Sequence, residues 1–288
     1  MFLITQFIGL YVVNYYSTSE KGLPYGMETP EIKQESDFYT IFPSLILAFV
    51  IAISLLIFLS KFKAEFFLKL WFFVVVAIAL GIALNVPLSS LKYSSLIAIL
   101  IALPLAWEKI YRRNLLVHNS TELLVYPGIA AVFVPILNLW TIIILLILIS
   151  IYDMWAVWHS GIMQKMAKYQ IQKLNIFSGF FVPYASKKVK EQIRNLKKTL
   201  SKKQLEKKKI KVNVAILGGG DVIFPIITAG VVLRILGIIP ALFVIAGATL
   251  GLTYLFFFAE KRKFYPAMPF ISTGIFAGMI LYWIIWMI

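Results

Sequence analysis

Long apolar stretches alternate with short polar ones along the whole chain. Ile41–Ser60 and Leu139–Tyr152, for example, contain no charged residue. A helix of about 20 apolar residues crosses the hydrocarbon core of a bilayer, so the pattern predicts membrane-spanning helices. The predicted spans cover residues 2–16, 41–60, 70–87, 94–110, 122–137, 138–162, 212–236, 238–258 and 267–288. We therefore expect an all-α protein, a polytopic membrane helix bundle with about nine transmembrane helices.

The composition agrees with burial in lipid. Hydrophobic residues make up 60% and charged residues 14% of the chain, with a mean hydropathy of +0.86, whereas a soluble domain is about 45–50% apolar and about 25% charged. There is no cysteine, which excludes disulfides and thiolate metal sites. No cluster of ligands accompanies His118 or His159, so we expect no metal and no cofactor.

The net charge of +15 is unevenly distributed. Even-numbered loops between the predicted spans are basic, whereas odd-numbered loops are acidic or short. The sixth loop is dense in lysine, and its only acids are Glu191 and Glu206. Basic loops stay in the cytoplasm, so we expect a multi-pass protein of the cell membrane with its N-terminus inside and its C-terminus outside. Topology explains the charge, and we expect no nucleic-acid partner.

The chain divides into three regions around the basic loop. Residues 1–162 form helices 1–6, residues 163–211 form the basic cytoplasmic loop, and residues 212–288 form helices 7–9. Within the loop, apolar residues recur at helical spacing at Val189, Ile193, Leu196 and Leu200. They predict a helix lying on anionic lipid headgroups, with a solvated linker as the alternative.

Two of the three aspartates, Asp153 and Asp221, lie inside predicted spans. A carboxylate at the bilayer centre costs about 2.5–3.5 kcal/mol, and such residues are usually functional. No Lys or Arg lies near either aspartate in its span. The sixth and seventh spans are antiparallel, and at 1.5 Å per residue the two aspartates lie about 18 and about 15 Å from the basic loop. They can therefore face each other.

Two carboxylates at one site cannot both ionise cheaply, so such a pair shares one proton. The ionised member can deprotonate a water molecule, and the protonated member can hydrogen-bond the carbonyl of a peptide bond. This chemistry needs neither metal nor cofactor. Which member holds the proton is a property of the pair, and the sequence does not assign it.

The backbone around Asp221 is predicted to be irregular. Gly218, Gly219 and Gly220 precede it, and Pro225 cannot donate an N–H to its carbonyl. Irregular backbone at membrane depth is tolerated where it is buried in protein or lines a water-filled cavity. Hydrolysis needs such a cavity, although close helix packing through small residues is the alternative for the glycines.

A second irregular segment, Tyr265-Pro266-Ala267-Met268-Pro269, opens the last span. Its prolines leave carbonyl groups without helical partners, and an extended substrate could pair with them. The alternative is an ordinary helix start at proline.

Tyr152-Asp153, Gly218–Asp221 and Pro266–Pro269, each on its own span and in this order, resemble the YD, GxGD and PAL motifs of the presenilin/signal peptide peptidase family. The resemblance covers nearly the whole chain, and its mixture of presenilin-like and peptidase-like residues suits an archaeal homologue. It implies an intramembrane aspartyl protease that cleaves single-span helices or signal peptide remnants. Asp153 and Asp221 would be the catalytic pair. The residues that would shape the site or dock substrate are Tyr152, Gly218, Gly219, Gly220, Pro266, Ala267, Met268 and Pro269.

The sequence departs from the family pattern at two positions. Gly219 stands where family members often carry a larger apolar residue, and Met268 replaces the usual leucine. The basic sixth loop implies the presenilin orientation. We expect no requirement for accessory subunits, whereas oligomerisation, the physiological substrate and autoprocessing of the loop are left open.

Two other functions fit part of the pattern. Prepilin and preflagellin peptidases also use two aspartates, but they have fewer spans and a shallower first aspartate. A proton-coupled transporter could use both carboxylates, yet it has no need of the segment at Pro266–Pro269. A transition-state mimic of aspartyl proteases would bind the protease and not the transporter.

Overall fold

The computed structural model describes residues 1–18, 22–28, 35–62, 65–112, 114–160, 178–184, 213–258 and 265–287. These residues form nine helices and one two-stranded sheet, which confirms the all-α membrane fold. The helices are α1 (Phe2–Thr18), α2 (Glu35–Lys61), α3 (Glu65–Asn85), α4 (Ser94–Tyr111), α5 (Leu115–Phe133), α6 (Leu139–Trp155), α10 (Gly219–Leu236), α11 (Ile238–Phe258) and α12 (Met268–Met287).

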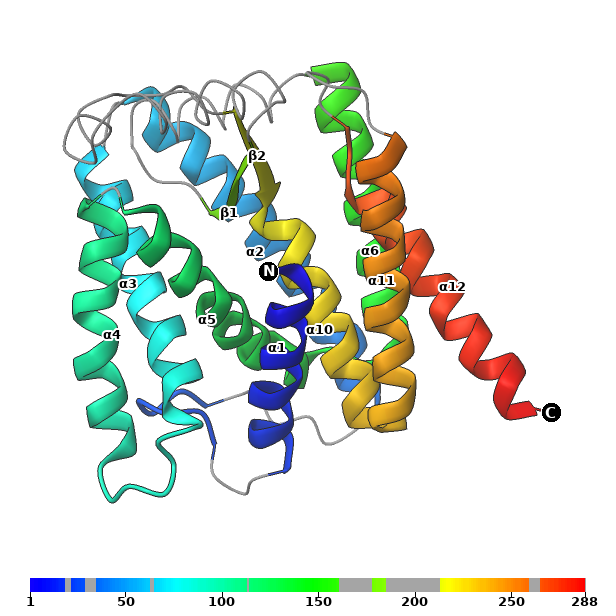
Figure 1. The fold of residues 1–288 in the computed structure, drawn as a ribbon, viewed down its shortest axis with the longest axis horizontal. Coiled ribbons are helices and arrows are strands. Elements are labelled where there is room, and N and C mark those ends of the chain that lie inside the picture. Colours follow the sequence, from blue (N-terminus) through cyan, green and yellow to red (C-terminus); the bar gives the residue numbers. More distant parts are fainter. Residues whose placement is uncertain are drawn as a thin grey trace, which may run out of the picture.

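The helices form one bundle with α1 and α10 near its middle. Figure 1 shows α3, α4 and α5 on one side and α6, α11 and α12 on the other. Helix α10 contacts α1, α5, α6, α11 and α12, and its residues Val222, Ile226, Val231 and Val232 are fully buried. The helix that carries the second predicted aspartate is therefore the centre of the fold.

Seven helices in the described part of the chain are long and apolar enough to cross a membrane by length and composition. They are α3, α4, α5, α6, α10, α11 and α12. The predicted spans 2–16 and 41–60 are helical as α1 and α2, but neither is among the seven. The outside of the bundle carries large apolar side chains such as Phe257 and Trp286, which are 83% and 69% exposed. Such a surface is stable in lipid, where apolar side chains need no covering.

The boundary predicted between the spans 122–137 and 138–162 separates α5 from α6. A single 3-10 turn, Val134–Ile136, ends α5, and Asn138 caps α6 by accepting a 2.8 Å hydrogen bond from the N–H of Thr141. Arg234 of α10 donates hydrogen bonds to the carbonyls of Pro135 and Leu137. The arginine thus satisfies carbonyl groups that the broken helix leaves free.

Helices α11 and α12 touch through glycine. A Cβ atom at Gly247, Gly251, Gly274 or Gly278 would collide with a backbone carbonyl of the facing helix. Small residues at this spacing let two membrane helices approach closely. The two GxxxG patterns therefore serve packing within the bundle.

We predict that Gly247→Ala lowers the free energy of unfolding by about 1–3 kcal/mol, because the added methyl group overpacks the contact with Gly274. Thermal unfolding in a fixed detergent would measure the loss. Gly22→Ala is the matched control, since an added Cβ at Gly22 meets no atom within 4 Å. Equal unfolding temperatures for both variants would contradict the close contact.

The helix expected from residue 212 begins later, at Gly219. Residues before it form β2 (Asn213–Gly218), which pairs antiparallel with β1 (Gly179–Tyr184) in the register Gly179↔Gly218. A short apolar run fits a strand or a helix equally well by periodicity, and here the partner strand decides. The rest of the sixth loop, including the stripe 189–200, lies outside the described residues.

The expected start of the fifth span at residue 122 is also wrong. Helix α5 begins at Leu115, and the side chain of Asn114 caps it by accepting hydrogen bonds from the N–H groups of Leu116 and Val117. The predicted start left His118, Asn119 and Thr121 in a loop. They are instead buried in α5, where His118 and Asn119 contact the backbone of β1.

Candidate active site

Asp153 lies near the end of α6 with its side chain buried. The residue is 6% exposed, and its Oδ2 accepts a 3.0 Å hydrogen bond from the backbone N–H of Met268. Immediately after α6 the chain makes a π-helical turn, Ala156–Ser160. Such turns are rare in proteins overall, but those that do occur are often found at functional sites. The first predicted aspartate is therefore held by the segment that opens α12.

Asp221 is the third residue of α10, and Gly218 caps this helix. The aspartate is half-buried, and its Oδ2 would stand 3.1 Å from a Cβ at Gly218, so the carboxyl group turns back toward Gly218. Helix α10 packs against α6, which carries Asp153, and against α12, whose Met268 N–H binds Asp153, so the two aspartates lie on neighbouring helices. Among the described residues, neither aspartate has an ion-pair partner.

The three glycines before Asp221 face different surroundings. A Cβ at Gly218 would stand 3.1 Å from Oδ2 of Asp221, and one at Gly219 would stand 2.6 Å from Oγ of Ser178. At Gly220 the nearest atom to an added Cβ is 3.7 Å away, which leaves room. An added Cβ is thus crowded at Gly218 and would force a shift of its neighbours at Gly219, whereas Gly220 is on the open side.

The segment that opens α12 reaches the site through its backbone. Pro266, Ala267 and Met268 are buried, and Pro269 is half-buried. One turn further on, the hydroxyl of Ser272 accepts a 3.0 Å hydrogen bond from the hydroxyl of Ser150 in α6. Helices α6 and α12 are therefore tied together at the level of Asp153 and again one turn away.

Gln6 of α1 is a polar neighbour of the site that the sequence reasoning missed. It is fully buried, and its Nε2 donates a 3.1 Å hydrogen bond to the carbonyl of Val222. Pro225 loosens α10 at this point, because it has no N–H for the carbonyl of Asp221. A glutamine within an apolar first span was the signal that could have revealed this contact.

Tyr152 does not join the aspartates, although it precedes Asp153. Its side chain is 47% exposed on the outer surface of α6, and its ring lies 6.3 Å from that of Trp155. Successive residues of a helix point about 100° apart, so a buried Asp153 directs its neighbour away from the site.

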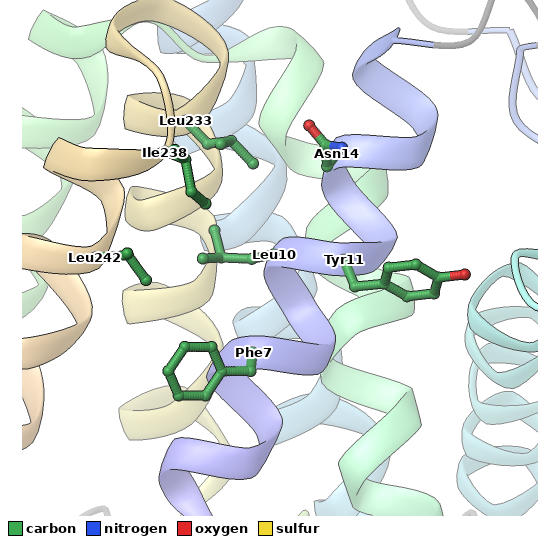
Figure 2. A pocket seen from close by; sticks show the side chains of 7 residues that line it. All are labelled: Phe7, Leu10, Tyr11, Asn14, Leu233, Ile238 and Leu242. Carbon is green, nitrogen blue, oxygen red and sulfur yellow. The ribbon is translucent and has the colours of Figure 1, made fainter.

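An apolar groove of about 450 Å³ lies elsewhere, between α1, α10 and α11. Figure 2 shows its lining, which includes Leu10 of α1, Leu233 of α10 and Leu242 of α11. Leu233 is 12 residues beyond Asp221 in the same helix, a distance of about 18 Å along the axis. No carboxylate or basic side chain lines this groove, so it is separate from the aspartate site.

A family model described as signal-peptide peptidase, presenilin aspartyl protease matches residues 1–288. The chain belongs to this family. It is an intramembrane aspartyl protease, a multi-pass protein that acts on transmembrane substrates within the bilayer. Neither the family nor the described residues support a proton-coupled transporter.

Two solved structures share the fold of this intramembrane protease. A presenilin family intramembrane aspartate protease in space group C222 superposes with a TM-score of 0.62 at 18% identity, covering 98% of this chain and 95% of its own. A structure with the same description in space group P2 gives 0.63 at 16% identity, covering 99% and 95%. No curated protein matches the chain.

Proposed function

We propose that Asp153 and Asp221 are the catalytic pair of this protease. The observation that carries the proposal is geometric: helix α10, which carries Asp221, packs against α6, which carries Asp153, and against α12, whose Met268 N–H binds Asp153. They are the only two aspartates inside predicted spans. An aspartyl protease needs two carboxyl groups that share a proton, and the packing of α10 against α6 and α12 supports such a pair.

The pair would hydrolyse a peptide bond by general acid and base catalysis. The ionised carboxylate takes a proton from water, and the protonated one donates a hydrogen bond to the scissile carbonyl. Water adds to that carbonyl, and the protons move to the leaving amine as the C–N bond breaks. The backbone N–H of Met268 holds the carboxyl group of Asp153 in place during these steps.

The docking surface would be the backbone of Pro266–Pro269. This segment touches Asp153 directly, and Pro266 and Pro269 interrupt regular helical hydrogen bonding. Gly218 and Gly219 would shape the site by close packing, and Gly220, on the open side, would leave space for substrate backbone. Tyr152 faces outward, so its contribution would be contact with the surrounding lipid or with a substrate helix that enters the site.

The substrates would be single-span helices or signal peptide remnants. The single chain would act without accessory subunits, and the basic loop would attract anionic lipids. Purified protein in lipid vesicles, incubated with single-span test substrates, should give products whose masses place the cut within the membrane. A transition-state mimic of aspartyl proteases should abolish them. Intact substrates across the panel, or cleavage insensitive to the mimic, would refute the proposal.

The sixth loop is predicted to be cytoplasmic, with the N-terminus inside and the C-terminus outside. The reason is the density of lysine in 163–211, which is retained on the cytoplasmic side. Reporter fusions within 186–209 of the protein expressed in a cell membrane would measure the side directly. An outward-facing reporter would invert the topology and the orientation of the substrates cleaved.

A further inference from the structure

A buried polar cluster joins α4, α5 and β1. It consists of Lys109 on α4 and of His118, Asn119 and Glu122 on α5, and we refer to it as the α5 polar cluster. Nζ of Lys109 lies 2.7 Å from Oε1 of Glu122, with side chains only 4% and 1% exposed. His118 packs between them, with Nδ1 3.4 Å from Lys109 and Nε2 3.6 Å from Glu122.

The α5 polar cluster binds the backbone of β1. The N–H of Gly179 donates a 3.2 Å hydrogen bond to Oε1 of Glu122, and the carbonyl of Gly179 lies 2.8 Å from Nε2 of His118. Asn119 donates a 2.8 Å bond to the carbonyl of Phe181 and accepts a 3.0 Å bond from its N–H. Residues two apart present their backbone groups to the same edge of a strand. One edge of β1 is therefore held by α5, and the other by β2.

The strand held in this way borders the start of α10. Gly179 pairs with Gly218, and the carbonyl of Ser178 accepts a 3.2 Å hydrogen bond from the N–H of Gly219. Asp221 follows two residues later. Figure 1 shows both strands at the end of the bundle where α5 and α10 begin. A continuous series of hydrogen bonds thus leads from Glu122 and Asn119 to the backbone that carries Asp221.

Side-chain packing also connects α5 to β1 and to the start of α10. The ring of Tyr126, one turn after Glu122 on α5, is buried against Phe180 of β1 at 5.7 Å between centroids. The Tyr126 hydroxyl would stand 3.0 Å from a Cβ at Gly219. If this face of α5 only had to fill the bundle, it could be apolar, because apolar replacements of buried ion pairs are often neutral or stabilising. The polar residues therefore point to a role beyond packing.

We propose that the α5 polar cluster is a positioning element for catalysis. By fixing β1, it fixes the paired strand β2 and thereby the placement of Asp221 against Asp153. The residues of the cluster do not touch the reacting atoms. The inference rests on the catalytic role proposed above for Asp221.

The test compares two buried residues on the same helix. Asn119→Ala removes both hydrogen bonds to Phe181, whereas Thr121→Val removes a hydroxyl that bonds only carbonyls of its own helix, at Val117 and His118. Cleavage by purified enzyme in vesicles is measured per site labelled by a transition-state mimic. We expect kcat of Asn119→Ala to fall about tenfold or more, because small misplacements of reacting groups slow catalysis strongly. KM should change less than kcat, and Thr121→Val should stay within about twofold of wild type.

A second pair of variants covers the case in which Asn119→Ala does not fold. Lys109→Met with Glu122→Gln removes both charges and keeps an amide oxygen that can accept from Gly179. Lys109→Met with Glu122→Leu removes that acceptor as well. We expect the glutamine variant to retain most of the wild-type kcat and the leucine variant to lose it. Equal kcat values for this pair, or for Asn119→Ala and Thr121→Val, would overturn the proposal.

Asp221→Asn is assayed beside these variants to separate the two hypotheses. If Asp221→Asn remains active, the proposed catalytic pair is wrong. If it is inactive while Asn119→Ala is as fast as wild type, the pair stands and the positioning role of the α5 polar cluster is wrong.

Discussion

Asp153→Asn and Asp221→Asn are each expected to reduce cleavage of a single-span substrate to background, a loss of about 10⁴-fold or more. Asparagine keeps the size of the side chain but cannot exchange a proton with water or with the leaving amine. For residue 153 it also keeps an oxygen that can accept from the N–H of Met268. Asp153→Ala would leave that buried N–H without a partner, at a cost of about 1–3 kcal/mol in stability. Product formation by purified enzyme in vesicles measures the effect.

Asp37→Asn serves as the control for these variants, because Asp37 lies in α2 outside the aspartate site. It should cleave within about twofold of wild type. The asparagine variants should unfold at temperatures close to that of wild type, which shows that they are folded. Cleavage above a tenth of the wild-type rate in either folded variant would eliminate the proposed pair.

Pro266→Ala combined with Pro269→Ala is expected to lower the cleavage rate about tenfold or more. A transmembrane substrate must unwind before water reaches its peptide bonds, and each exposed backbone group costs several kcal/mol in lipid. The backbone of Pro266–Pro269 would offset that cost, and alanine at both positions lets helix α12 extend through it. Rates of wild type and double variant on one substrate measure the difference.

Two further comparisons identify the cause of that loss. Glycine or proline near the cut site of the substrate should partly restore cleavage by the double variant, because such a substrate unwinds more easily. Pro240→Ala is the matched control, since Pro240 is a buried proline in the first turn of α11. If the double variant cleaves the unmodified substrate as fast as Pro240→Ala, then residues 266–269 are only a helix start.

The membrane bundle was predictable from sequence because hydrophobicity is a local property. Each apolar run is long enough to require a helix in lipid, whatever its neighbours do. The boundary between the spans 122–137 and 138–162 was also predictable, since Pro135 removes a backbone donor there. The prominence of Asp153 and Asp221 has the same origin, because a carboxylate in an apolar run is costly wherever it points.

Contacts between distant segments could not be read in this way. The N–H of Met268 that holds Asp153 lies 115 positions along the chain, and Tyr152 faces outward only because α6 buries the next residue. The short run before Gly218 is extended because β1 supplies a hydrogen-bonding partner from within the basic loop. Periodicity in one segment carries no information about such a partner.

The sequence by itself determined that this protein lies in a lipid bilayer, that it is helical, and that two of its aspartates are costly to bury there. Each result follows from the free energy of single residues or of single apolar runs in a bilayer. Only the tertiary structure decided how those acids are held. Lys109 and Glu122 lie at the facing ends of the fourth and fifth predicted spans, yet the fold buries them as an ion pair, and Glu122 accepts a hydrogen bond from the N–H of Gly179. The physical reason is that a buried polar group must find partners, and the partners are chosen by the fold.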